Sequence, residues 1–180
     1  KHPQSWYQGW IDDVELRKKS SSGGAAKALS RRFVEDGGVV VSCCFRNGVF
    51  EFESAQNFDE LEKFTGSKYV KSNPFGVYKK VQSLLKQGRK VLFIGLPCQV
   101  GALKTVTGEN EQLYTVDLIC HGTPSPKLLG DYLALHKVKL EEISSISFRY
   151  KDVFGLAQNR IPLSQPGSCD NYLLAFLCGL

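Results

Sequence analysis

The pattern of apolar and polar positions along the chain predicts alternating helices and strands. After Pro74, apolar residues recur at the spacing of one helix face, whereas short continuous apolar runs elsewhere are typical of buried strands. The predicted helices cover residues 25–35, 57–64 and 74–86, a stretch beginning at Pro97, and residues 126–136 and 170–180; the predicted strands cover residues 39–45, 49–52, 91–94, 113–119 and 143–150.

The order of these elements predicts the fold class. Strand–helix alternation from about residue 74 to residue 150 is typical of parallel βαβ units. Asn47-Gly48 between two apolar runs predicts one β-hairpin near residues 39–53. We therefore expect a single α/β domain over residues 1–180, with a mixed, largely parallel sheet flanked by helices. A length of 180 residues suits one domain.

Composition narrows the class of protein further. Hydrophobic residues make up 42% and charged residues 23%, which is ordinary for a globular domain. The net charge of +5 is spread along the chain, which does not favour nucleic-acid binding. No apolar run is long enough for a membrane span, and the first residues do not form a signal-peptide core. Because the chain contains no methionine, we expect it to be a fragment of a longer protein.

Six cysteines in a chain of this size indicate metal or redox chemistry in a reducing compartment, and we expect a cytoplasmic protein. Cys43 and Cys44 are adjacent in a predicted strand, so they point to opposite faces and at least one is expected in the core. Cys169 and Cys178 lie in the terminal segment and carry less information.

Two apolar runs stop abruptly at a cysteine: Val-Leu-Phe-Ile-Gly-Leu-Pro-Cys98 and Val-Asp-Leu-Ile-Cys120-His121. Buried parallel strands deliver side chains to the carboxyl edge of a sheet in this way. Cys98 follows a proline that suits the first turn of a helix, where partial positive charge favours the thiolate. Metal ligation, a redox pair and nucleophilic catalysis all remain open, as does a structural role for small residues at tight junctions.

Two further segments offer sites for an anion. Ser-Ser-Ser-Gly-Gly at 20–24 precedes a predicted helix, so its N–H groups and hydroxyls form a cradle suited to phosphate, although such caps are also common in structural roles. The segment 66–72 offers the Lys68 ammonium, the Tyr69 ring and serine hydroxyls, and a surface loop would have the same composition.

Four motifs in a fixed order connect these features: Ser-Ser-Ser-Gly-Gly at 20–24, Gly-Ser-Lys-Tyr-Val-Lys-Ser at 66–72, Val-Leu-Phe-Ile-Gly-Leu-Pro-Cys-Gln-Val at 91–100 and Val-Asp-Leu-Ile-Cys-His-Gly-Thr-Pro-Ser-Pro at 116–126. In this order they resemble the β-subunit family of coenzyme F420 hydrogenases and dehydrogenases. The resemblance extends from about Gly9 to Leu180 and divides the chain into an N-terminal-type part, about 1–73, and a C-terminal-type part, about 74–180.

The resemblance implies an oxidoreductase that holds FAD beside a 4Fe-4S cluster. Such proteins pass electrons to or from a carrier, deazaflavin F420 or ferredoxin, and work with other subunits of a complex. The residues that match flavin-associated motifs are Ser21, Ser22, Gly23, Gly24, Lys68, Tyr69 and Ser72, and those that match cluster ligands are Cys98 and Cys120. No catalytic residue is assigned.

Members of the family usually also carry an N-terminal ferredoxin-like segment and a later Ser-Cys-x-x-Cys segment. We expect this chain to lack both, so it supplies two of the four thiolates of a cluster, and activity is expected of the intact protein. Two other function classes stay open. One is a non-redox enzyme with Cys98 or Cys120 as nucleophile and His121 as base. The other is a structural or assembly domain without cofactors.

Overall fold

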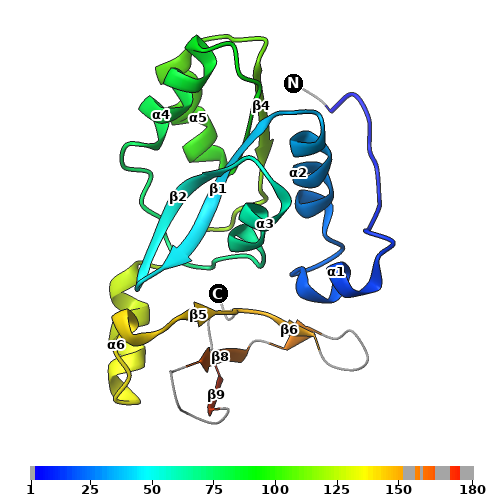
Figure 1. Cartoon of the computed structure of the whole chain (residues 1–180). Helices are drawn as coiled ribbons and strands as arrows, with labels where there is room; N and C mark the ends of the chain where they lie inside the picture. Colours follow the sequence, from blue (N-terminus) through cyan, green and yellow to red (C-terminus); the bar gives the residue numbers. More distant parts are fainter. Residues whose placement is uncertain (1–2, 152–156, 159, 165–170, 175–180) are drawn as a thin grey trace.

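The fold is built on a four-stranded sheet with the order β2-β1-β3-β4 (Figure 1). The computed structural model describes residues 3–151, 157–158, 160–164 and 171–174. The strands of this sheet are β1 (Val39–Arg46), β2 (Val49–Ala55), β3 (Val91–Gly95) and β4 (Leu113–Asp117).

Strand pairing confirms the predicted mixed, largely parallel sheet. β1 pairs with β2 in antiparallel register, from Val40 opposite Ala55 to the hairpin end. Asn47 and Gly48 both have positive φ, at 48° and 78°, as a two-residue hairpin turn requires. β3 runs parallel to β1 on one side and to β4 on the other.

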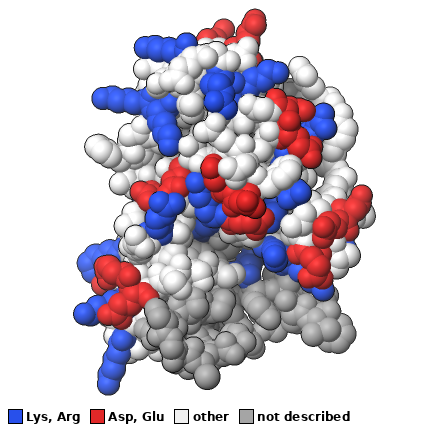
Figure 2. All heavy atoms as spheres, in the orientation of Figure 1, with Lys and Arg blue, Asp and Glu red and all other residues white. Residues whose placement is uncertain are grey.

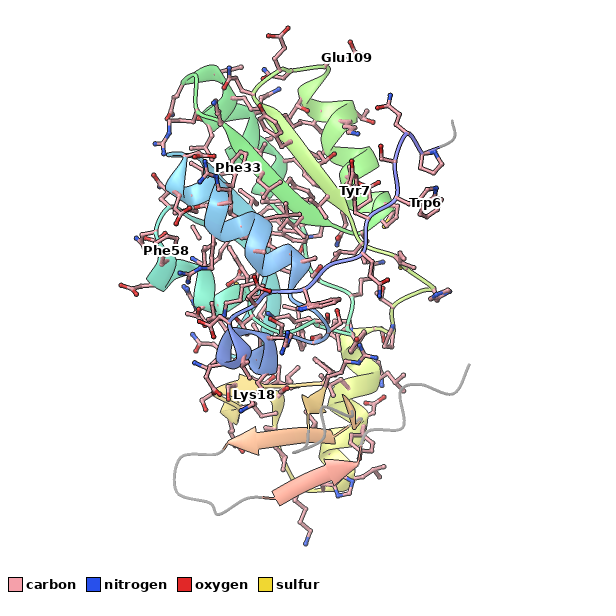
Figure 3. The ribbon with its side chains drawn as sticks, turned by 90° about the vertical axis from the view of Figure 1, so that its right-hand side faces the viewer. Trp6, Tyr7, Lys18, Phe33, Phe58 and Glu109 are labelled. Carbon is pink, nitrogen blue, oxygen red and sulfur yellow. The ribbon has the colours of Figure 1, made fainter. Side chains whose placement is uncertain are left out.

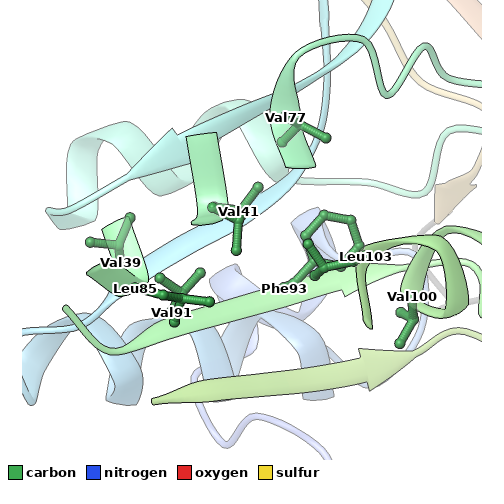
Figure 4. Packing of buried hydrophobic residues seen from close by; sticks show 9 residues of the cluster. Val39, Val41, Val77, Leu85, Val91, Phe93, Val100 and Leu103 are labelled. Carbon is green, nitrogen blue, oxygen red and sulfur yellow. The ribbon is translucent and has the colours of Figure 1, made fainter. Parts of the chain in front are cut away.

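Helices cover both faces of the sheet because the side chains of β1 and β3 alternate between them. On one face, a buried cluster joins Val41 and Phe93 to helices α4 (Val77–Lys86) and α5 (Pro97–Thr107) (Figure 4). On the other face, Val40 and Leu92 meet residues of the helices that precede and follow the hairpin. Those elements are α2 (Ala25–Glu35), α3 (Phe58–Leu61) and the 3-10 turn η1 (Glu62–Phe64).

Most helices predicted from the sequence occur where expected. α2 has the predicted bounds, α4 buries one face, and Pro97 is the first residue of α5. In the helix predicted over 57–64, the Asn57 side chain accepts the N–H of Glu60 at 2.9 Å, but the segment divides into α3 and η1. A short helix, α1 (Val14–Lys19), was not predicted; the Asp13 side chain caps it.

The segment before α1 runs along the surface near α2, with Trp6 and Tyr7 exposed (Figure 3). Lys, Arg, Asp and Glu side chains are interspersed over the face of the molecule seen in Figure 2. Within the described residues, no helix combines the length and hydrophobicity needed to cross a bilayer.

The C-terminal elements lie beyond one end of the main sheet (Figure 1). A third buried cluster connects them to the hairpin: Phe50 of β2 packs with Leu133 of α6 and with Ile143 and Phe148. These elements are α6 (Pro126–Leu135), η2 (Leu140–Glu142), β5 (Ser145–Ile146), β6 (Tyr150–Lys151), β7 (Ala157–Gln158), β8 (Arg160–Ser164) and β9 (Asn171–Leu174). β5, β8 and β9 form a separate antiparallel sheet.

Three further predicted elements differ from the structure. The strand predicted over 143–150 is reduced to β5 and the start of β6, outside the main sheet. The strand predicted to Ile119 ends at Asp117. The terminal helix predicted over 170–180 is wrong at Asn171–Leu174, which is strand β9; residue 170 and residues 175–180 lie outside the described part of the chain. A short apolar run does not distinguish a strand from a helix until its pairing partner is known.

Phe93 is the core residue whose truncation we expect to destabilise the fold strongly. Its ring is fully buried and stacks on Phe52, with centroids 5.1 Å apart and planes within 6°. Phe93→Ala removes this packing, so we expect the free energy of unfolding in urea to fall by about 3–5 kcal/mol. As a control, Phe75→Ala, at a ring that is 91% exposed, should change it by no more than about 0.5 kcal/mol. Equal effects of the two substitutions would contradict this placement of the core.

Candidate functional site

The first motif lies directly before α2 in a tight turn. Gly24 is the N-cap of α2 with φ 85°, and a Cβ there would lie 2.8 Å from Cδ1 of Ile11. The carbonyl of Gly23 accepts the N–H of Ile11 at 2.8 Å. A Cβ at Gly23 would lie 3.0 Å from the carbonyl oxygen of Gly9. The tight contact at Gly23 and the positive φ at Gly24 therefore both favour glycine.

Hydrogen bonds bring distant residues to the serines of this motif. The Ser21 hydroxyl accepts the N–H of Ser67 at 2.7 Å, which joins the first motif to the second. The Arg149 guanidinium donates to the Ser21 carbonyl at 3.3 Å. Ser22 is exposed beside them. This group of hydroxyls and a cation comes from three segments of the chain.

Lys68 is half-buried, so its positive charge is partly withdrawn from solvent. Its ammonium donates to the carbonyls of Lys63 and Thr65 at 3.3 and 3.0 Å. Burial lowers the pKa of Lys68 to about 8, while the thiols of Cys43 and Cys44 act in the opposite direction. Among the described residues no carboxylate pairs with this ammonium. The site therefore holds an uncompensated cation, which favours an anionic ligand.

Tyr69 and Ser72 lie deeper than Ser22. The Tyr69 ring is half-buried and meets Phe148 edge-on, with centroids 5.9 Å apart. Ser72 is buried, and its hydroxyl oxygen accepts the side-chain amide of Gln99 at 3.0 Å. Burial raises the pKa of the Cys43 thiol, although the charge of Lys68 and a hydrogen bond with Ser72 oppose this effect. The hydrogen bond between Ser72 and Gln99 connects the second motif to the third.

Cys98 lies in the first turn of α5, immediately after the buried strand β3, and is exposed. Gly95 ends that strand; a Cβ there would lie 2.8 Å from Cε1 of Phe93, so the turn into α5 requires glycine. Burial raises the pKa of Tyr78, and Cys98 adds to this shift. Cys98 is accessible to a ligand or reagent.

The fourth motif begins in the last two residues of β4 and leaves the strand at the same edge of the sheet. The Leu118 N–H donates to the carbonyl of Gly95 at 2.9 Å, and Pro124 accepts the N–H of Lys71 at 2.9 Å. Cys120 is exposed, and its sulfur accepts the N–H of Gly122 at 3.3 Å. The motif is therefore bonded to both the second and the third.

The two exposed thiols, Cys98 and Cys120, follow the ends of adjacent parallel strands, as the sequence predicted, and neither is buried among aliphatic side chains. Cys44 is buried in β1 and Cys43 is half-buried on the opposite face, as the strand pattern predicted. No group of three or more metal-ligating side chains occurs within the part of the chain that is described. Cys169 and Cys178 lie outside it.

Sequence patterns did not assign a role to Gln99 or Arg149. Gln99 is the third residue of a helix, where a side chain that caps the preceding backbone is common, and this position could have indicated its role. Nothing in the local sequence connects Arg149 with Ser21, because 128 residues separate them.

Residues 88–172 match the model of a protein family described as the C terminus of the beta subunit of coenzyme F420 hydrogenase/dehydrogenase. This stretch, somewhat less than half of the chain, matches the family that the four motifs indicated. The fold is similar to a chain in the structure of the F420-reducing [NiFe] hydrogenase complex from Methanosarcina barkeri, with a TM-score of 0.59 and 19% identity. The alignment covers 92% of this chain and 58% of that chain. No curated protein matches the sequence.

The charge state of Lys68 gives stability a pH dependence. Between pH 8 and 10.5 the unfolded chain keeps the proton on Lys68 and the folded chain has released it. The free energy of unfolding therefore gains a contribution that rises with pH across this window. We expect wild type to gain stability relative to Lys68→Met from pH 8 to 10.5, by at most about 3 kcal/mol.

Urea denaturation at several pH values measures this difference, and the comparison cancels the titration of groups that do not interact with Lys68. Lys79→Met, at an exposed position of α4, is the control and should give a pH-independent difference. A flat difference for Lys68→Met as well would show that its ammonium is solvated.

Proposed function

We propose that this chain is part of an electron-transfer oxidoreductase subunit that uses FAD next to a 4Fe-4S cluster. Electrons would pass between a carrier, deazaflavin F420 or ferredoxin, and a partner subunit or substrate. One observation carries the proposal: the flavin-associated motifs and the two cysteine motifs are hydrogen-bonded to one another, and the second of them contains the half-buried Lys68. The family description, which names hydrogenases and dehydrogenases, supports redox chemistry.

The residues of the site fit FAD. The pyrophosphate of FAD is anionic, and Lys68 offers a cation that no carboxylate compensates among the described residues. The hydroxyls of Ser21 and Ser22 and the exposed guanidinium of Arg149 add donors at the start of α2. When bound, FAD would supply the exchange between a two-electron hydride step and single electrons.

For the cluster, the described residues supply only part of the ligand set. A 4Fe-4S cluster takes four thiolates. Cys98 and Cys120 are exposed at one edge of the sheet, whereas Cys44 is buried in the core. We propose Cys98 and Cys120 as two of the ligands, with the others supplied from outside the described residues.

The environment and partners of the protein belong to the same proposal. The described cysteines are free thiols, which is consistent with a reducing compartment such as the cytoplasm. The structural neighbour is a chain of a hydrogenase complex, which supports work alongside other subunits.

The flavin part of the proposal predicts a yellow protein with flavin absorbance when the full-length protein is freshly purified. Lys68→Met removes a charge-assisted contact, so we expect the dissociation constant of FAD, measured by fluorescence quenching, to rise about 10- to 100-fold. Lys79→Met should leave it unchanged. A wild-type protein that neither contains nor binds FAD would overturn the flavin assignment.

The iron–sulfur part predicts iron and acid-labile sulfide in the full-length protein. We expect Cys98→Ser and Cys120→Ser each to lose most of the iron measured by atomic absorption, because serine replaces a thiolate ligand. Cys44→Ala, which removes a buried thiol from β1, is the control and should retain it. Iron retained at the wild-type level in both serine variants would remove Cys98 and Cys120 from the ligand set.

A further inference from the structure

Gln99 is a buried polar residue that joins the flavin-associated motif at Ser72 to the motif that contains Cys98. Its side chain is 8% exposed and belongs to the first turn of α5, next to Cys98. A buried amide that lacks partners is costly, so its hydrogen bonds indicate what it holds in place. Every buried side-chain nitrogen and oxygen of the described residues has a partner.

The amide oxygen of Gln99 holds the start of α5. It accepts the N–H of Leu96 at 2.9 Å. Leu96 is the N-cap of the helix, and its hydrocarbon side chain offers no acceptor of its own. At Gly95, a Cβ would lie 3.2 Å from this oxygen, so glycine leaves room for it. The contact fixes the turn that carries Cys98.

The amide nitrogen of Gln99 holds the second motif. It donates to the hydroxyl oxygen of Ser72 at 3.0 Å, and both residues are buried. Because this oxygen accepts from Gln99, the Ser72 proton is free to point to the Cys43 thiol, with which the hydroxyl also interacts. One side chain therefore sets the orientation of the Ser72 hydroxyl and the path of the backbone before Cys98.

We propose that Gln99 is a positioning residue that couples the flavin-associated motif at Ser72 to the first turn of α5, which carries Cys98. The inference rests on the proposed function for its role toward FAD, whereas the coupling between Ser72 and Leu96 is a property of the chain itself. A helix cap alone would not need the contact with Ser72. Coupling predicts that a substitution at Ser72 changes the hydrogen exchange of the Leu96 N–H.

The first measurement uses full-length protein without added cofactor. Hydrogen exchange of the Leu96 amide, followed by mass spectrometry, should accelerate about five-fold or more in Gln99→Met, which removes the acceptor. It should also accelerate in Ser72→Ala, because the Gln99 amide then loses one of its two contacts. Gln99→Glu, whose carboxylate can accept from both Leu96 and Ser72, should restore slow exchange.

Gln87→Met is the matched control. Gln87 also donates to a serine, Ser83, at 3.4 Å, but at an exposed position at the end of α4. Leu96 exchange should not change in this variant. Unchanged Leu96 exchange in Ser72→Ala, or fast exchange in Gln99→Glu, would overturn the coupling.

The second measurement is a double-mutant cycle on FAD affinity. Ser72→Ala and Gln99→Met should each weaken FAD binding about five- to ten-fold. The double variant should bind FAD with about the affinity of the single variant that binds it less tightly, because both changes interrupt the same contact. Losses that multiply would overturn the positioning role toward FAD. A wild-type protein that binds no FAD but shows the coupled exchange would overturn the proposed function and leave the coupling intact.

Discussion

The structure depends on the pairing of β3 between β1 and β4. All five residues of β3 are buried, and the strand is parallel to both neighbours. This register decides where the chain emerges at the carboxyl edge of the sheet, with Gly95 paired with Asp117. A shift by one residue would reverse the faces of β3 and move Phe93 away from α4 and α5 to the opposite face of the sheet. The positions of the two cysteine motifs therefore follow from the packing of one strand.

The contacts at the carboxyl edge of the sheet are hydrogen bonds and a charge, whereas those of the core are apolar. The core is held by apolar burial on both faces of the sheet. At the site, Lys68 is half-buried without a carboxylate partner among the described residues, and Ser72 and Gln99 are buried as a hydrogen-bonded pair. A buried uncompensated cation destabilises a fold, and such groups are concentrated at functional sites. This contrast supports a site for an anionic ligand here.

Elements with strong local signals were predicted well. The hairpin, α2, α4 and the start of α5 each carry a turn glycine, a proline or apolar residues at regular spacing. Beyond α6 the same reasoning was less successful. The segment 143–150 looked like a further strand of the parallel sheet, and β9 looked like a helix, because short apolar runs take their conformation from whichever partner they pair with.

The sequence by itself determined the order of the elements and the four motifs, since local spacing and turn residues are written directly in the chain. It also placed Cys98 and Cys120 after adjacent strands. Only the tertiary structure decided which motifs meet: Ser21 bonds Ser67 across 46 positions, and Gln99 bonds Ser72 across 27. The physical reason is that such contacts depend on helix packing and strand register, which no local pattern encodes.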